Sequence, residues 1–136
     1  MLRRLIIGVW LGLATLNAAS LHYAKSYEAA LAEANASNKM VMVLIVKTYC
    51  PWCHKMQEKT LTDESIVEKI NAHFVPVILN KEEVSLPDHL FARFVPTTYF
   101  LTPGEEELNS AIGYWGVSDF HDYLDDAIDS FKAYKP

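Results

Sequence analysis

An unbroken apolar run, Met40–Val46, predicts a β-strand. The run does not alternate with polar residues, which is typical of a strand buried on both faces, as in parallel sheets. A second apolar run, Phe74–Leu79, follows after a helix-like segment. Strand, helix and strand make a βαβ unit, so we expect the two strands to lie parallel. Pro76 cannot donate a ladder hydrogen bond and should lie near the strand start or face away from a neighbouring strand.

Helical periodicity occurs on both sides of this unit. Ser26 can cap a helix that runs to about Asn35, and Ser118 can cap a last helix that reaches Phe131. The apolar positions on one face of these helices are Tyr27, Ala30, Leu31 and Ala34 in the first and Phe120, Tyr123, Leu124, Ala127, Ile128 and Phe131 in the last.

The segment between the two apolar runs predicts two helical pieces. The first begins at Cys50 and ends or bends near Leu61. Thr62 then caps the second piece, Asp63–Ala72. The inward positions of the second piece are Ile66, Val67 and Ile70.

The chain after the second strand predicts a short helix and a β-hairpin. A polar loop leads into Leu86–Phe94, which predicts the helix. Val95–Leu101 is rich in β-branched and aromatic residues and predicts a strand that begins at Pro96. Turn residues then lead to Leu108–Ile112, which predicts an antiparallel return strand. These elements together predict an α/β fold with a central mixed β-sheet flanked by helices on both faces.

The N-terminus carries a different signal from the rest of the chain. Two arginines precede the apolar stretch Leu5–Leu16, and small residues follow it, which is the pattern of a secretory signal peptide. The apolar stretch is shorter than the roughly 20 residues of a spanning helix, so a permanent anchor is the less favoured alternative. We expect residues 1–20 to be removed by cleavage after Ser20 or Ala19. Residues 21–136 then form one domain, periplasmic or secreted, without stable membrane insertion.

The charge of the chain restricts its partners. The formal net charge is −5, and loss of Arg3 and Arg4 with the signal peptide makes it more negative. No basic stripe is present in the sequence. An acidic domain of this kind is a poor candidate for binding nucleic acid or anionic membrane surfaces.

Both cysteines of the chain lie in Cys50-Pro51-Trp52-Cys53, shortly after the first apolar run. A thiol at the start of a helix faces unpaired backbone N–H groups and the positive end of the helix dipole, which favour the reactive thiolate. Export places the pair where disulfides persist. A disulfide between residues so close in sequence closes too small a loop to stabilise the fold much. The pair therefore indicates redox chemistry.

The chain from about Ser26 to Phe131 resembles the thioredoxin superfamily. The features that carry the resemblance are the buried strand before Cys50–Cys53, the triplet Val95-Pro96-Thr97, and Gly113 shortly before the last helix. Cys53-His54-Lys55-Met56 and the segments near it are similar to exported thioredoxin-like proteins and to the C-terminal periplasmic domain of a membrane thiol reductase. The resemblance implies a thioredoxin-like fold and an exported thiol–disulfide oxidoreductase.

The resemblance also implies roles for individual residues. Cys50 is the exposed nucleophile that forms a mixed disulfide with a partner, and Cys53 is the shielded resolving thiol. Pro96 is a cis proline packed against the pair, and the backbone of Val95 pairs with an extended substrate segment. Trp52 is directed outward between the cysteines and is expected to contact partners. Tyr114 and Trp115 either border the same groove or pack into the core.

The partners implied are protein thiols and disulfides, together with an upstream thiol electron donor, for which a membrane thiol reductase is the candidate. No cofactor is needed beyond the cysteine pair. The resemblance favours a reductase, and a disulfide oxidase or isomerase on the same fold is an alternative.

Four residues bear on the reactivity of the pair. Leu44 occupies the position of a buried aspartate that thioredoxin carries six residues before its first cysteine, so the group that assists Cys53 is open, with Glu58 as one candidate. His54 shares a helix face with Cys50, and with Lys47 it is a candidate for lowering the pKa of the Cys50 thiol. The alternative for His54 is an exposed polar position without coupling.

The cysteine motif is also compatible with two other classes of protein. Cys50–His54 reads as the Cys-x-x-Cys-His haem-attachment pattern, so a c-type cytochrome with His54 as axial ligand is an alternative. The βαβ order and the Val-Pro-Thr triplet argue against it. A binding module with an incidental disulfide is a third possibility. The remaining histidines lack metal-ligand spacing, so we expect no metal site.

Overall fold

The computed structural model describes residues 19–134. The expected signal peptide, residues 1–20, therefore lies almost wholly outside the described residues, and its cleavage stays a prediction. Among the residues described, no helix is long and apolar enough to cross a bilayer.

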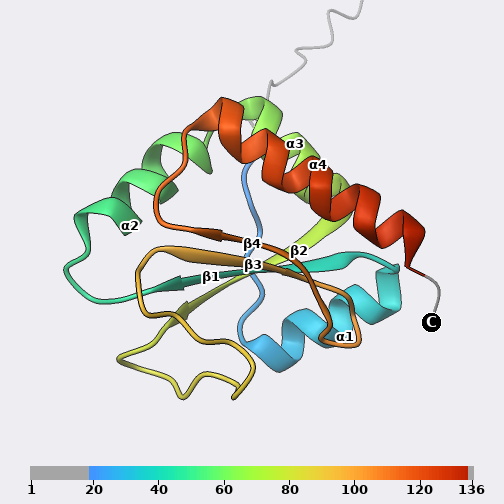
Figure 1. Cartoon of the computed structure of the whole chain (residues 1–136), viewed down its shortest axis with the longest axis horizontal. Coiled ribbons are helices and arrows are strands. Elements are labelled where there is room, and N and C mark those ends of the chain that lie inside the picture. Colours follow the sequence, from blue (N-terminus) through green and yellow to red (C-terminus); the bar gives the residue numbers. More distant parts are fainter. Residues whose placement is uncertain (1–18, 135–136) are drawn as a thin grey trace, which may run out of the picture.

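Four strands form one mixed sheet in the order β2-β1-β3-β4 (Figure 1). β1 (Met40–Val46) pairs in parallel with β2 (Phe74–Asn80) and antiparallel with β3 (Thr97–Leu101). β4 (Glu107–Ile112) runs antiparallel to β3 at the edge. The predicted strands and the parallel βαβ pair are confirmed, although β3 begins at Thr97 rather than at Pro96.

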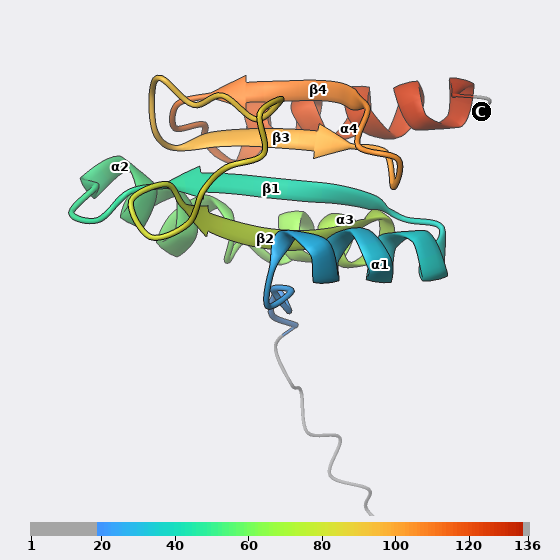
Figure 2. The same ribbon diagram turned by 90° about the horizontal axis from the view of Figure 1, so that it is seen from below.

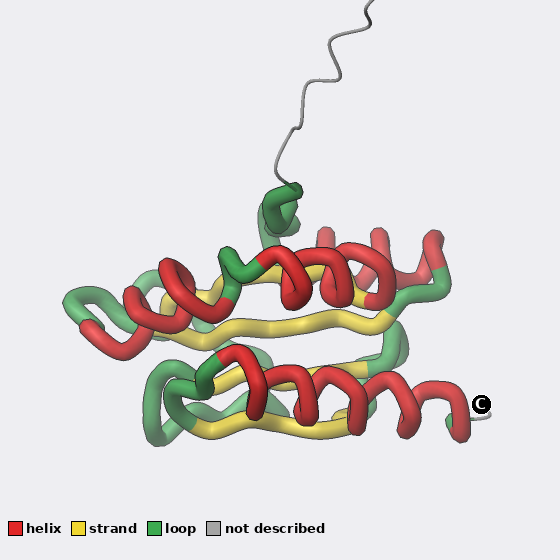
Figure 3. The backbone as a smooth tube through the Cα atoms, turned by 90° about the horizontal axis from the view of Figure 1, so that it is seen from above, coloured by secondary structure: helices red, strands yellow, loops and turns green. Residues whose placement is uncertain are grey.

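Helices lie on both faces of the sheet (Figure 2). α1 (Tyr27–Ser37) packs on one face. On the other face, α2 (Pro51–Lys55) and the π-helical turn η1 (Met56–Thr60) lead from the end of β1 into α3 (Glu64–His73). α4 (Val117–Ala133) runs beside α3 over the same face (Figure 3). The expected central mixed sheet with helices on both faces is confirmed.

β1 is the centre of the core because every one of its residues is buried. Its alternate side chains divide between two apolar clusters. Met42 and Leu44 face the cluster under α3 and α4, whereas Val43 faces α1. Phe100 of β3 lies in the first cluster, with its ring centroid 5.5 Å from that of Phe74 and 6.0 Å from that of Phe120. The absence of polar alternation in this run therefore reflects burial on both sides.

Pro76 lies in the edge strand β2 with its nitrogen directed away from β1. Its carbonyl oxygen accepts a hydrogen bond from the backbone N–H of Ala24, 2.8 Å away, on the outer side of the strand. The nitrogen and carbonyl of one strand residue point to the same side, so the missing N–H falls on that outer side. The proline thus interrupts no bond between β1 and β2.

Two helix caps differ from the prediction. Asp63, not Thr62, caps α3, because its carboxylate accepts from the backbone N–H groups of Ser65 and Ile66. The Thr62 hydroxyl instead donates to the carbonyl of Glu58, 2.7 Å away. α4 begins at Val117, so Ser118 lies inside its first turn rather than capping it. Neighbouring polar residues compete for one cap, and the path of the chain decides between them.

The predicted helix over Leu86–Phe94 does not form, and the segment is a loop. Leu90 and Ala92 are buried while Phe91 between them is exposed, which is an alternation and not a helical face. The carbonyl of Ala92 accepts from the ammonium of Lys81, 3.0 Å away, and that of Phe91 accepts from the hydroxyl of Tyr99. Both carbonyls belong to the last turn of the predicted helix, where they would have no intrahelical partner, so these contacts do not replace helical hydrogen bonds. The burial of alternate side chains in the core determines the path of the loop, and the contacts with Lys81 and Tyr99 hold it in place.

Candidate active site

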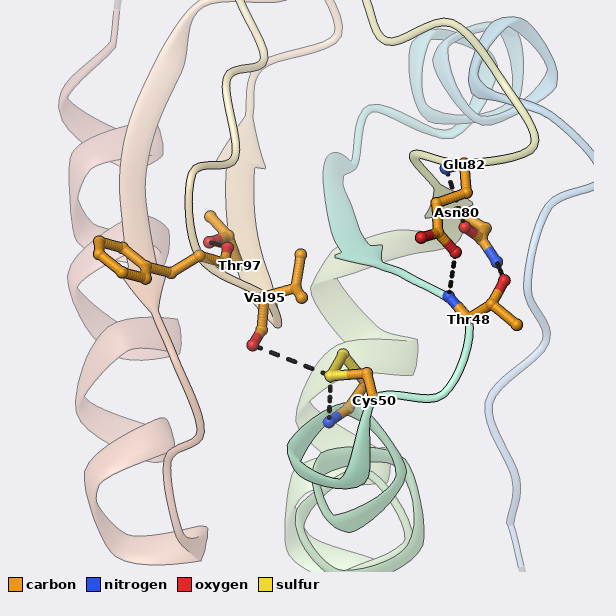
Figure 4. Close-up of a disulfide and its surroundings, with 8 residues drawn as sticks. Thr48, Cys50, Asn80, Glu82, Val95 and Thr97 are labelled. Atoms are coloured by element: carbon orange, nitrogen blue, oxygen red, sulfur yellow. Dashed lines mark hydrogen bonds between the residues drawn. A yellow bond between two sulfur atoms is a disulfide. The ribbon is translucent and has the colours of Figure 1, made fainter.

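Cys50 and Cys53 are joined by a disulfide at the start of α2, with their Cα atoms 5.2 Å apart. Cys50 is the N-cap of this helix, and Pro51 occupies its first turn, where no N–H is needed. The backbone N–H of Cys53 donates to the sulfur of Cys50 at 3.2 Å (Figure 4). In the reduced protein this N–H and the helix dipole favour a thiolate on Cys50 over one on Cys53.

The two cysteines are almost equally buried. Cys50 is 5% exposed and Cys53 is 3% exposed, and both belong to the apolar cluster under α3 and α4. The expectation of an exposed Cys50 is therefore wrong for the disulfide form. The N-cap position turns the Cys50 sulfur back over the first helical turn, where it accepts the Cys53 N–H instead of pointing to solvent.

The segment before β3 lies against the disulfide. The Val95–Pro96 peptide bond is cis, and the carbonyl oxygen of Val95 is 3.9 Å from the Cys50 sulfur (Figure 4). The Pro96 carbonyl accepts from the N–H of Gly113, 2.8 Å away, and the Thr97 hydroxyl donates to the Phe94 carbonyl at 2.6 Å. Gly113 has a φ of 88°, a region that glycine enters at little cost. Hydrogen bonds on both sides thus hold Val95 and Pro96 beside the reactive bond.

A hollow of about 560 Å³ opens beside the disulfide. Both pKa-tuning candidates, Lys47 and His54, line it together with Cys50 and Cys53. The His54 side chain is 75% exposed, and its Nδ1 lies 3.9 Å from a carboxylate oxygen of Glu58. His54 and Lys47 thus share the hollow with the sulfurs, but the ionic contact of His54 is with Glu58.

The loop between β1 and α2 is tied to the end of β2. The backbone N–H of Thr48 donates to a carboxylate oxygen of Glu82 at 2.9 Å, and the Asn80 side-chain amide donates to the Thr48 hydroxyl at 3.2 Å (Figure 4). The Asn80 amide oxygen accepts from the N–H of Glu82 at 3.0 Å. Hydrogen bonding to Thr48, followed by the charges of Lys47 and Lys81, holds the pKa of Glu82 below its usual value.

This network also supports an unusual backbone position next to Cys50. Tyr49 has a φ of 55°, in the left-handed region that non-glycine residues adopt at a cost, and its side chain is 95% exposed. We did not predict Asn80 and Glu82 as site residues. Parallel strands end at the same edge of a sheet, so their positions directly after β2 could have indicated contact with the residues after β1.

Neither Leu44, at the position of the usual acid, nor the candidate Glu58 provides an acid in contact with Cys53. Leu44 is fully buried within the apolar cluster that holds both cysteines. The Glu58 side chain is 70% exposed and lies beside His54. The geometry therefore gives no support to Glu58 as the group that assists Cys53.

The outward direction expected for Trp52 is observed, and its ring has two neighbours. Trp52 is 56% exposed, and its ring centroid lies 5.6 Å from that of Tyr114, in the loop after β4. The Lys55 ammonium lies 5.0 Å from the Trp52 ring centroid and 4.7 Å from that of Tyr114. Trp115 packs against Tyr123 instead, with ring centroids 5.2 Å apart. Tyr114 thus borders the cysteine helix, whereas Trp115 contacts α4.

Two further polar clusters lie away from the disulfide. The Tyr27 hydroxyl is 3.1 Å from Nε2 of His89, and Nε2 of His121 is 2.8 Å from the Ser65 hydroxyl. Burial raises the pKa of Tyr27, with Glu105 adding to the effect. Among residues 19–134, no three His, Cys, Asp or Glu side chains lie close enough to hold a metal ion. These histidines tie α1 to the loop before β3 and α3 to α4.

The sequence matches the model of one protein family over residues 13–116. This family is Thioredox_DsbH, described as protein of unknown function, DUF255. Spermatogenesis-associated protein 20 from Mus musculus is 30% identical over 81 residues, which are 53% of this chain and 10% of that protein. The chain thus spans about a tenth of the length of this relative.

Solved structures share the fold over most of the chain. A thioredoxin from Thermus thermophilus has a TM-score of 0.71 and 26% identity, and the match covers 84% of this chain and 92% of that one. A structure described as DsbH oxidoreductase has a TM-score of 0.60 and 18% identity, with 90% and 94% covered. The thioredoxin-like fold implied by the Cys-x-x-Cys and Val-Pro-Thr motifs is confirmed.

Proposed function

Because the chain belongs to the Thioredox_DsbH family of the thioredoxin superfamily, we propose that it is exported and reduces disulfide bonds in partner proteins. Its class, a thioredoxin-like protein-disulfide oxidoreductase, follows from the family, the fold and the Cys50–Cys53 pair. The direction of the reaction, its location and its partners are the proposed part. The observation that carries the proposal is the disulfide at the start of α2, beside the Val95 carbonyl.

The reaction is a two-step thiol–disulfide exchange. The Cys50 thiolate of the reduced protein attacks one sulfur of a partner disulfide; that bond breaks, and the leaving thiolate of the partner takes up a proton. Cys53, once deprotonated, attacks the Cys50 sulfur of the mixed disulfide. The second partner thiolate leaves, and the Cys50–Cys53 disulfide forms. Two electrons pass from the cysteine pair to the partner, whose disulfide becomes two thiols.

The surroundings of the pair support this order of attack. The Cys53 N–H, 3.2 Å from the Cys50 sulfur, stabilises negative charge on Cys50 and makes it the first nucleophile. Lys47 and His54, at the hollow beside the pair, add positive potential when protonated. In the mixed disulfide the Cys50 sulfur stays within one helical turn of Cys53, so the second attack needs little movement.

Partner binding in this proposal uses the backbone beside the disulfide. The Val95 carbonyl lies 3.9 Å from the Cys50 sulfur, so an extended partner segment that presents its sulfur to Cys50 lies within reach of the Val95 backbone. Trp52, exposed between the cysteines, contacts the same partner.

The proposed location rests on the sequence before residue 20. A charged start, a short apolar stretch and small residues support export and cleavage. An exported reductase needs an upstream thiol donor to restore its own pair, and a membrane thiol reductase is the class that supplies electrons there. The c-type cytochrome alternative is not supported, since the cysteines form a disulfide within a thioredoxin-like fold.

Trapping of mixed disulfides tests the exchange scheme. In Cys53→Ser the resolving thiol is gone, so partners should accumulate as disulfides on Cys50 in the native host and appear as adducts on a non-reducing gel. The control is the double variant Cys50→Ser with Cys53→Ser, which should trap none. Equal adducts from both variants, or none from the first, would contradict the two-step scheme.

Equilibration with glutathione tests the direction. A reductase should lie toward the reducing end of the range of about −270 mV to about −120 mV that related proteins cover. If the pair is still reduced in a glutathione buffer poised near the oxidising end of this range, its own potential lies at that end. The protein would then be an oxidase or isomerase instead.

A further inference from the structure

A cation lies over two aromatic rings beside the disulfide. The Lys55 ammonium is 5.0 Å from the Trp52 ring centroid and 4.7 Å from that of Tyr114, and the two rings are 5.6 Å apart. We refer to these three residues as the Trp52–Lys55–Tyr114 cluster. Its side chains are partly or largely exposed. Contact with two rings restricts the long lysine side chain, so less entropy is lost when its charge meets a partner.

The Trp52–Lys55–Tyr114 cluster is formed by the helix of the cysteines and the loop after β4. Trp52 is two residues from Cys50 on the same helical segment. Tyr114 follows Gly113, whose N–H binds the carbonyl of Pro96 beside the disulfide. The cluster therefore joins the helix of the cysteines to the loop that supports Val95 and Pro96. A polypeptide bound to Cys50 touches this surface.

The charge of Lys55 has no carboxylate partner among the described residues. The carboxylate nearest to Lys55 in sequence, that of Glu58, lies beside His54. The ion pairs of the described chain involve other lysines. Although the whole chain is acidic, with a formal net charge of −5, Lys55 on the cysteine helix and Lys47 at the hollow both place a positive charge near the disulfide.

We propose that the Trp52–Lys55–Tyr114 cluster selects partner segments that carry an acidic side chain close to their reactive cysteine. The partner carboxylate meets the Lys55 ammonium, and apolar atoms of the segment pack on the exposed faces of Trp52 and Tyr114. This inference rests on the proposed disulfide reduction and names the class of substrate for it. The attraction acts mainly on the rate of productive encounter, so salt weakens it.

Two matched disulfide-containing peptides test the preference. They are identical except that one carries Glu and the other Lys two residues from the cysteine. The wild-type protein should show a kcat/KM about threefold higher for the acidic peptide, the size expected of an exposed charge pair, and the ratio should approach one at high salt. Lys55→Glu should reverse the preference.

The ratio of the kcat/KM values for the two peptides removes the effect that the substitution has on the reactivity of Cys50 itself. A new negative charge near Cys50 also disfavours its thiolate, but this changes the rate for both peptides equally and cancels in the ratio. The control is Lys25→Glu, which makes the same charge change at an exposed site before α1, on the opposite face of the sheet from α2. This variant should keep the wild-type ratio.

The outcomes separate the inference from the function on which it rests. Equal rates for the two peptides in the wild type, or the same change in ratio from Lys25→Glu as from Lys55→Glu, would overturn the selection of acidic segments. Reduction of 2-hydroxyethyl disulfide, which is small and uncharged, tests the exchange chemistry alone. Loss of that reaction in the wild type would count against the proposed function, whereas its presence with no peptide preference would count against the inference only.

Discussion

At the scale of single residues, hydrogen bonds to backbone groups determine where the reactive sulfur lies. The N–H of Cys53 binds the Cys50 sulfur, and the carboxylate of Glu82 binds the N–H of Thr48 two residues before it. Tyr49 between them adopts a left-handed conformation that the flanking contacts have to maintain. Glu82 thus acts on Cys50 through the loop, as a positioning residue.

Substitution of Glu82 separates its hydrogen bond from its charge. Glu82→Ala leaves the Thr48 N–H without its acceptor and loosens the loop, so alkylation of reduced Cys50 by iodoacetamide at pH 7 should slow by about threefold. Glu82→Gln keeps an acceptor oxygen but removes the charge, so its rate should equal or slightly exceed that of the wild type. If both variants react faster by the same factor, the charge and not the hydrogen bond is the operative feature.

At the scale of elements, capping residues and tertiary contacts decide where helices begin and whether they form. Asp63 caps α3, and its pKa is lowered, first by the hydrogen bond from the Ser65 hydroxyl and then by the N–H of Ile66. The loop before β3 shows the opposite case, because Leu90 and Ala92 are buried in the core on either side of the exposed Phe91 and no helix forms. The prediction of a short helix there failed because this burial depends on packing against residues distant in sequence.

Acid should weaken the cap of α3. Because the pKa of Asp63 is lower in the folded than in the unfolded protein, its contribution is complete above the unfolded value of about 4 and is lost as pH falls through the folded value. Urea denaturation of the oxidised protein should therefore show stability decreasing below pH 4. Asp63→Ala should be less stable than the wild type at pH 7 and should show a shallower decrease in acid. An unchanged pH profile in this variant would contradict the assignment of Asp63 as the cap.

At the scale of the whole molecule, one buried strand organises two apolar layers and places the redox pair at its end. β1 contributes side chains to both layers, and the disulfide follows it directly. The layer under α3 and α4 contains both cysteines and the neighbouring, mutually tilted rings of Phe74, Phe100 and Phe120. Packing of this layer therefore supports the site as well as the fold.

Removal of the Phe100 ring, which lies between those of Phe74 and Phe120, should strongly destabilise the fold. Phe100 is fully buried, so Phe100→Ala should lower the free energy of unfolding by about 3–5 kcal/mol, from lost burial and the cavity left behind. Denaturation monitored by circular dichroism measures the change. The matched control is Phe94→Ala, because this side chain is 63% exposed and its loss should cost little. Similar losses in both variants would contradict the position of Phe100 at the centre of the core.

The sequence by itself determined the features that depend on local pattern. Apolar runs, β-branched residues and turn signals identify the four strands, and a period of 3.6 residues identifies the helices α1, α3 and α4, because burial of one face repeats along a helix. The paired cysteines after a buried strand and the Val-Pro-Thr triplet identify the family. Only the tertiary structure decided the burial of Cys50, the approach of Val95 to its sulfur, and the contact of Lys55 with two rings. Each of these joins residues from different elements, and periodicity within one element carries no information about what another element places beside it.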